Sequence, residues 1–161
     1  MLEECLFSEK VWIEGLLVCQ VRYGGEPIMR ETVTTYVTQS KFFSPVFNAA
    51  IFDGPIRIYF AQYQEAQALK LYFNLQERFG EVRKQARGIF KERGRNIFVM
   101  LYPTAETFDG SFGERVEERA ELCEVKCDSL GNDYVVGVRG PLEDNVYDIL
   151  FNQMDDIVRA V

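Results

Sequence analysis

Residues 11–23 alternate between apolar and polar positions, and this alternation predicts the first extended element of the chain. The odd positions are mostly apolar, whereas the even positions include Glu14, Gln20 and Arg22. A period of two is typical of a strand with one buried face, so one long strand is expected here. The segment 27–38 follows a pair of glycines and is rich in Val, Thr, Ile and Tyr, which predicts a second strand paired to the first as a hairpin.

The length of the connection decides the register of this predicted hairpin. A two-residue connection would place Cys19 opposite Arg30 and mix polar with apolar residues on one face. A three-residue connection separates the faces, with Val21 opposite Met29, Leu17 opposite Val33 and Ile13 opposite Val37, and is preferred. Under that register Trp12 and the nearby Tyr36 lie on the otherwise polar face, beside Leu16 and Val18. An aromatic set on a polar face can anchor a partner or lie beneath a helix.

The middle of the chain contains three clear patterns. Residues 40–47 are apolar but aperiodic and contain a proline, as expected of a packed connection. A short alternating strand follows at 56–60, and a helix is predicted over 62–79 from the helical spacing of its apolar residues. The unbroken apolar run 97–102 predicts a strand covered on both faces, and therefore central in its sheet.

The remaining segments complete the predicted order. Residues 81–93 fit a helix, although the following 93–96 would equally turn a hairpin, and the helix is preferred. Like charges four residues apart argue against a helix over 115–127, so this segment is predicted to form a hairpin with 134–138. A helix is predicted over 143–160, with an apolar stripe that includes Val146, Ile149, Leu150, Met154, Ile157 and Val161. Its wide apolar face fits simple burial or a dimer contact.

These elements predict an α+β fold. We expect a single domain spanning residues 1–161, with a largely antiparallel sheet of about six strands and helices packed on one face. No Ser-, Gly- or Pro-rich stretch is long enough to form a linker.

The chain of 161 residues contains no histidine, and this excludes several kinds of chemistry. Histidine is the side chain that ordinarily exchanges protons near neutral pH. Ser-His-Asp and Cys-His nucleophiles and His-bearing zinc or haem sites are therefore ruled out. Carboxylates, lysines or tyrosines could still catalyse a reaction, so enzymatic activity stays uncertain and is disfavoured. No cofactor, metal or catalytic residue is predicted.

The net charge of −7 disfavours nucleic acid and anionic membranes as partners. The first residues are acidic and lack an apolar core, so no secretory signal is expected. No apolar run approaches the roughly 18 residues of a membrane-spanning helix. A soluble, cytoplasmic protein is therefore expected.

Four cysteines are too few and too scattered to suggest a disulfide framework. Cys123 and Cys127 are separated by three residues, which matches neither the CxxC redox motif nor a zinc knuckle. On a strand they would share one face, so small core residues are preferred over a metal or redox pair. Cys5, near the terminus, is the best candidate for a reactive thiol.

Positive charge is concentrated in one segment of this acidic chain. Residues 78–95 contain seven basic and two acidic side chains, so the rest of the chain carries −12. The predicted binding residues of this basic segment are Arg83, Lys84, Arg87, Lys91, Arg93 and Arg95. These charges could simply face solvent, or they could pair with the acidic stretch at 114–124 of the same chain or of a second subunit. Alternatively, they could bind a phosphate-bearing ligand or an acidic protein.

No motif assigns a reaction. The chain lacks GxGxxG and GxxxxGK[ST] patterns, and residues 110–113 lack the spacing of a nucleophilic serine. The first hypothesis is a non-enzymatic protein-interaction or regulatory module, homodimeric, that uses the basic segment and aromatic surface to hold an acidic partner. The alternative is a sensor or binding domain for an anionic small molecule, contacted by Arg57 or the basic segment.

Overall fold

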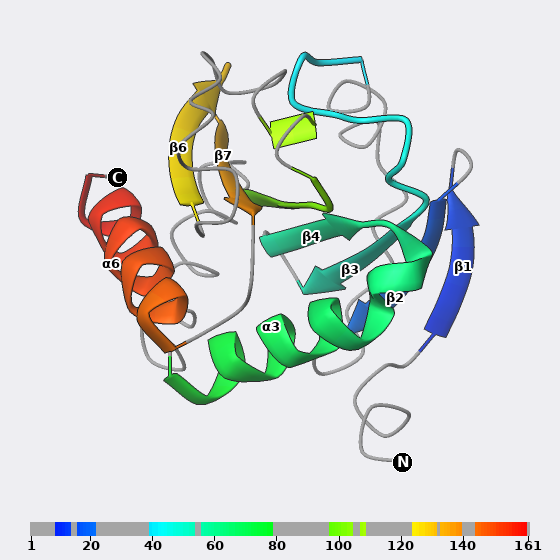
Figure 1. The fold of residues 1–161 in the computed structure, drawn as a ribbon, viewed down its shortest axis with the longest axis horizontal. Coiled ribbons are helices and arrows are strands. Elements are labelled where there is room, and N and C mark those ends of the chain that lie inside the picture. Colours follow the sequence, from blue (N-terminus) through cyan, green and yellow to red (C-terminus); the bar gives the residue numbers. More distant parts are fainter. Residues whose placement is uncertain are drawn as a thin grey trace.

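A computed structural model of the chain describes residues 9–13, 16–21, 39–53, 56–78, 97–104, 107–108, 124–131, 133–139 and 144–160. In these residues seven strands form one sheet, accompanied by two α-helices and a short 3-10 helix (Figure 1). The strands are β1 (Glu9–Ile13), β2 (Leu16–Val21), β3 (Ala49–Asp53), β4 (Ile56–Phe60), β5 (Ile97–Tyr102), β6 (Glu124–Leu130) and β7 (Asp133–Arg139). The helices are η1 (Gln62–Gln64), α3 (Glu65–Arg78) and α6 (Asp144–Ala160).

The sheet is mixed, with the strand order β1-β2-β3-β4-β5-β7-β6. The pairs β2–β3, β4–β5 and β5–β7 are parallel, whereas β1–β2, β3–β4 and β6–β7 are antiparallel. The α+β class is confirmed, but the prediction of a largely antiparallel sheet is wrong. The connection from β4 to β5 contains α3, and a crossover of this kind joins parallel neighbours.

The N-terminal strand is divided in two, contrary to the prediction of one long strand over 11–23. β1 and β2 pair antiparallel with Ile13 opposite Leu16, so the chain reverses between them. Gly15 lies at this division, and glycine weakens the interior of a strand. Leu17 is paired with Trp12 on one side and Ala49 on the other, which excludes the predicted pairing of Leu17 with Val33. The predicted strand at 27–38 lies outside the described residues.

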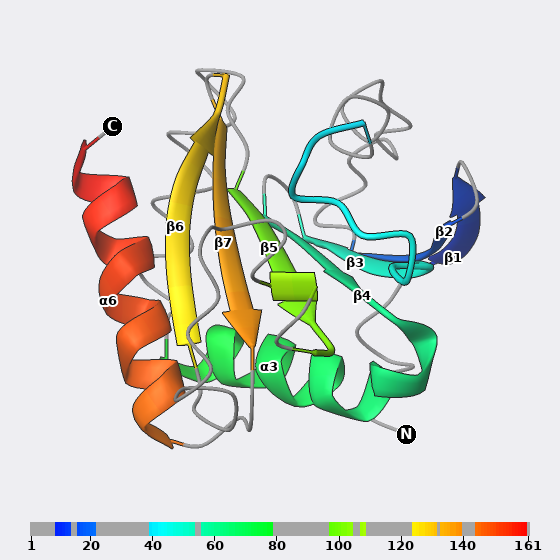
Figure 2. The same cartoon turned by 45° about the horizontal axis from the view of Figure 1, so that its top comes forward.

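The two helices pack on the same face of the sheet, as predicted, and we call it the helix-side face (Figure 2). Its core combines apolar side chains of the central strands with those of α3 and α6. The helical spacing over 62–79 predicts a stripe of Ala68, Tyr72, Leu75 and Phe79, of which the first three are buried and Phe79 lies outside the described residues. Among the described side chains of α6, Val146, Tyr147 and Leu150 are buried, whereas Ile149, expected in the stripe, is exposed. The side chains of Met154, Ile157 and Val161, the other members of the predicted stripe, lie outside the described part of the chain.

The opposite face of the sheet, which we call the loop-side face, is also covered. The segment 39–48 crosses it and places Phe42 and Phe47 in a second core (Figure 2). Tyr102 anchors this segment because its hydroxyl donates a 2.5 Å hydrogen bond to the carbonyl oxygen of Phe42. The prediction of a packed connection at 40–47 is confirmed, but the strand β3 that follows it was not expected.

Two other predicted strand arrangements are confirmed. β5 lies between β4 and β7 and is buried at every position, as its unbroken apolar sequence predicted. β6 and β7 form the predicted hairpin, with Val125 opposite Val138. β6 extends to Leu130, so the connection is shorter than expected, and Gly131 provides a left-handed backbone conformation (φ 61°) that most residues disfavour. The undecided segment 81–93 lies outside the described residues.

Candidate functional site

Most of the predicted binding residues cannot be placed. Trp12 lies in β1, within the described part of the chain. The other seven lie outside it, namely Tyr36, Arg83, Lys84, Arg87, Lys91, Arg93 and Arg95. The structure therefore locates one of the eight residues of the predicted surface, Trp12.

Trp12 is exposed, with 67% of its surface accessible. Its register partner in β2 is Leu17, which in turn pairs with Ala49 of the helix-side core. Leu16 and Val18 belong to the loop-side core instead. The prediction that Trp12 lies beside Leu16 and Val18 is therefore wrong, because successive residues of a strand point to opposite faces.

Burial decreases steadily along the sheet row that contains Trp12. The row runs from Phe60 through Ala49 and Leu17 to Trp12. Phe60 and Ala49 are buried, Leu17 is half-buried and Trp12 is exposed. The cover that α3 provides to the central strands thus does not extend to Trp12, which faces solvent.

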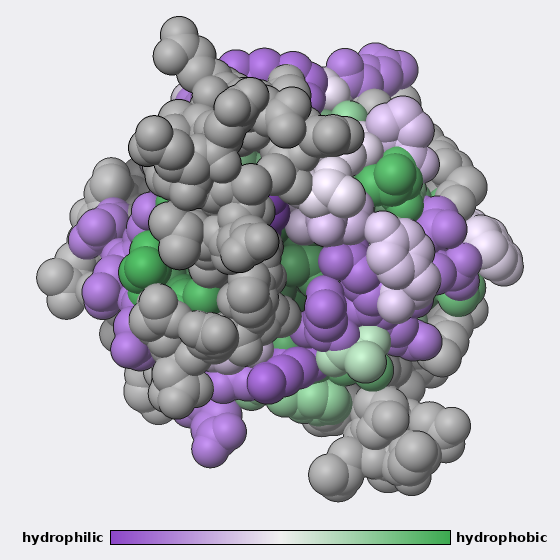
Figure 3. All heavy atoms as spheres, in the orientation of Figure 1, coloured by the Kyte–Doolittle hydropathy of each residue, from purple (hydrophilic) through white to green (hydrophobic). Residues whose placement is uncertain are grey.

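A second exposed aromatic residue lies in η1, directly after β4. Tyr63 is 76% exposed and follows the row residue Phe60 by three positions. In Figure 3, pale side chains of intermediate hydropathy gather on the right, the side on which Figure 1 places β1. Both Tyr63 and Trp12 are exposed aromatic side chains, but they lie on different elements, so Tyr63 serves as a matched reference for Trp12.

Arg57 is buried on the loop-side face, with 1% of its surface exposed. Its position in β4 follows the alternating pattern that predicted a half-exposed strand, but every residue of β4 is buried. The guanidinium carbon lies 4.5 Å from the centroid of the Phe52 ring, a cation–π contact strengthened by exclusion of water. This packing gives Arg57 a structural role, and a ligand could reach it only if the loop-side cover moved.

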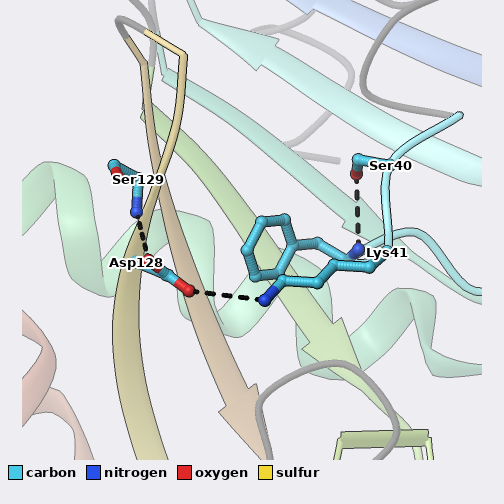
Figure 4. Close-up of polar contacts among 5 residues, drawn as sticks. Ser40, Lys41, Asp128 and Ser129 are labelled. Atoms are coloured by element: carbon cyan, nitrogen blue, oxygen red, sulfur yellow. Dashed lines mark hydrogen bonds and ion pairs between the residues drawn. The ribbon is translucent and has the colours of Figure 1, made fainter.

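The same face carries a second buried guanidinium and two lysines. The ring of Phe108 lies 5.9 Å from the guanidinium of Arg139 and 5.5 Å from the ammonium of Lys126. At the rim, the ammonium of Lys41 forms a 3.8 Å ion pair with Asp128, whose other oxygen accepts a 2.8 Å hydrogen bond from the Ser129 amide (Figure 4). This ion pair links the 39–48 segment to β6.

A buried hydrogen bond joins α3 to β3. The hydroxyl of Tyr72 donates to Asp53 Oδ2 over 3.2 Å, and both side chains are almost fully buried. In the sequence Asp53 precedes Gly54 and Pro55, a motif typical of a turn. Nothing in that local motif indicates that the aspartate ends a buried strand, so the contact could not be found from the sequence.

Cys127 is exposed on β6, which contradicts its prediction as a core residue. Val125 and Cys127 share the helix-side face, but β6 is the last strand of the sheet in the described residues. Partial burial of the thiol, followed by the negative charge of Asp128, raises the pKa of Cys127. A raised pKa reduces the thiolate fraction at neutral pH and makes Cys127 a poor nucleophile. Cys123 lies outside the described residues.

In the described residues, no group of three or more acidic or cysteine side chains is placed to hold a metal ion. No helix among them has the length and apolar character needed to cross a bilayer. Comparison with known proteins found that no family model, no curated protein and no solved structure matches this chain.

Proposed function

We propose that this protein is a non-enzymatic protein-interaction module whose contact surface centres on Trp12 of β1. The observation that carries the proposal is the 67% exposure of this indole on the terminal strand of the described sheet. Tryptophan is enriched among the residues that dominate binding energy at protein interfaces. Its large apolar surface gains free energy when a partner removes it from water.

The strand that carries Trp12 adds a second reason. Within the described residues β1 pairs with β2 alone, and a terminal strand presents backbone donors and acceptors to a partner. Strand addition to such an edge uses main-chain hydrogen bonds for affinity and side chains for specificity. A protein or peptide is therefore the class of partner that this surface fits best.

Site-specific photo-crosslinking tests the proposal. A photoreactive phenylalanine analogue at position 12 is expected to give discrete adducts with protein in cells, because the indole position would lie inside the contact. The same analogue at Tyr63, which is somewhat more exposed and lies in η1, serves as the matched control. Adducts at position 63 of equal yield, or none at position 12, would reject Trp12 as the centre of the surface.

We further propose that the basic segment strengthens the contact by meeting an acidic surface. Charge reversal by Arg87→Glu together with Lys91→Glu should weaken association about tenfold at low salt, since each residue would change from attraction to repulsion. The effect should shrink in high salt, where exposed charges are screened. Light scattering of the purified variant and of the wild type, each at low and at high salt, measures the association and checks this prediction. Equal affinity of the variant and the wild type at low salt would remove the basic segment from the proposed surface.

A second candidate function is the binding of an anionic small molecule. The observation that favours it is the presence of Arg57, Arg139 and Lys126 on one face of the sheet. Phosphate and carboxylate groups are bound well by arginine. A thermal-shift screen of phosphorylated metabolites distinguishes the two candidates, because a ligand that binds the folded state raises the melting temperature.

A further inference from the structure

We propose that the partner of β1 is the β1 strand of a second copy of this chain, paired antiparallel about a two-fold axis that passes beside Trp12. This inference rests on the proposed function and names its partner. The two sheets would then join edge to edge, and the helix-side faces of both copies would lie on the same side of the joined sheet.

The position of β1 makes such a pairing geometrically simple. In Figures 1 and 2, β1 lies at the border of the sheet, at the end away from α6. Among the described strands its neighbour is β2, through the register Glu9–Gln20 to Ile13–Leu16. A two-fold axis is the commonest symmetry of protein dimers, and it brings the same surface patch of both copies together.

Three antiparallel registers are centred within β1, and their residue pairs differ. An axis beside Lys10 would place two lysines directly opposite each other, which is destabilising. An axis beside Val11 would pair Glu9 with Ile13 and Lys10 with Trp12 of the second copy. An axis beside Trp12 would pair the two tryptophans with each other and Val11 with Ile13.

The register centred on Trp12 pairs an aromatic residue with an aromatic residue and an apolar residue with an apolar residue. Aromatic pairs and apolar pairs opposite each other on neighbouring strands each contribute about 0.2–1 kcal/mol relative to alanine pairs. The two indoles would lie side by side on the helix-side surface that α3 leaves open, beside the half-buried Leu17. This register therefore removes Trp12 from water in both copies at once.

The size of the contact limits its strength. β1 contains five residues, and a stable protein interface ordinarily buries about 1,200–2,000 Å² in total. One short strand pair with a single aromatic anchor on each copy buries less, so the dimer should form and dissociate with concentration, in the micromolar range. Two copies with a net charge of −7 repel each other, so salt should leave the association unchanged or strengthen it. This response belongs to the β1 pairing itself, whereas the contribution of the basic segment, which Arg87→Glu together with Lys91→Glu removes, acts in the opposite direction.

The emission of Trp12 gives a direct measurement, because it is the chain's single tryptophan. Purified protein should shift from monomer to dimer in sedimentation experiments as its concentration rises through the micromolar range. Over the same range the tryptophan emission should shift to shorter wavelength and become less accessible to acrylamide. Trp12→Ser should weaken self-association by about tenfold or more, whereas the control Tyr63→Ser should leave it unchanged.

Disulfide trapping tests the register while both tryptophans stay in place. In a background with Cys5, Cys123 and Cys127 replaced by serine, a Val11→Cys chain mixed with an Ile13→Cys chain should form a linked heterodimer on oxidation. Residues opposite each other in antiparallel strands lie within the distance that a disulfide spans. Each variant alone should link slowly, because its two cysteines would be offset along the strands. Faster linking of Val11→Cys alone would place the axis beside Val11 and overturn the proposed register.

Three outcomes would overturn this inference, and they differ in what they imply for the proposed function. If the purified chain stays monomeric while position 12 still crosslinks to a different protein in cells, the self-pairing is wrong and the interaction surface stands. If the chain dimerises with no change in tryptophan emission or quenching, the dimer contact lies elsewhere, and the self-pairing of β1 is again wrong. If position 12 gives no adduct in cells and the purified chain stays monomeric, both proposals fail.

Discussion

Replacing Phe98 with alanine is expected to lower the free energy of unfolding by about 3–5 kcal/mol, as truncation of a fully buried phenylalanine does in other cores. Phe98 lies in the central strand β5 and points into the loop-side core, where none of its surface is exposed. Its ring lies 6.2 Å from that of Tyr59, and its register neighbours are Arg57 and Val135. Strands on both sides prevent the sheet from closing around the missing ring, so a cavity would remain.

Urea unfolding followed by circular dichroism measures this loss. The control is Phe73→Ala, because Phe73 is only partly buried at the edge of the helix-side core. Its removal should cost about 1–2 kcal/mol, since partly buried positions lose less transfer free energy and leave no closed cavity. Equal losses in the two variants would contradict the description of the loop-side face as a true core.

Replacing Arg57 with alanine is expected to lower the free energy of unfolding by about 2–4 kcal/mol, through lost packing and a lost cation–π contact in a site closed to bulk solvent. Arg57 is almost fully buried, and its guanidinium stacks over Phe52 at 4.5 Å. Chemical denaturation gives the loss directly.

The chain offers a matched control for Arg57→Ala. Lys41 also lies over a phenylalanine ring, that of Phe42 at 5.1 Å, but it is exposed. Lys41→Ala also removes the surface ion pair with Asp128, and such pairs contribute about 0–1 kcal/mol. A loss for Arg57→Ala no larger than that for Lys41→Ala would show that Arg57 is dispensable for folding. The arginine would then be better explained by ligand binding, the second candidate function.

Elements with a strong and uniform pattern were predictable from the sequence. The run Ile97–Tyr102 predicted a central strand covered on both faces, and β5 is that strand. The helices α3 and α6 were predicted to within a few residues, because helical periodicity over several turns has few alternative explanations. Hairpin β6–β7 was predictable because its two strands adjoin in sequence.

Elements decided by distant parts of the chain were not predictable. The alternation over 56–60 sets Arg57 apart from the apolar residues of its strand, and its burial depends on a core that includes Phe42 and Phe47 of the 39–48 segment. Parallel pairing of β2 with β3 joins segments separated by 27 residues, counted from Val21 to Ala49, and no local pattern specifies it. The division at Gly15 was overlooked because the alternation on either side is continuous in phase.

For Trp12 the structure bears on its exposure and its place in the sheet, whereas its role in binding stays a prediction. An aromatic residue among polar neighbours identified Trp12 as a contact candidate, and Trp12 is indeed exposed. Its face of the sheet was wrong, because the assumed hairpin partner of β2 was incorrect. The buried Tyr72–Asp53 contact was missed, since it depends on a helix meeting a strand end 19 residues earlier.

The central place of β5 has a consequence for synthesis of the protein on the ribosome. The strand is translated before β7, which supplies its second neighbour in the finished sheet. During that interval the sequence Ile-Phe-Val-Met-Leu-Tyr has an unsatisfied edge, and short apolar segments of this kind readily aggregate. Chains that terminate before residue 133 would keep this edge permanently and would depend on chaperones to stay in solution.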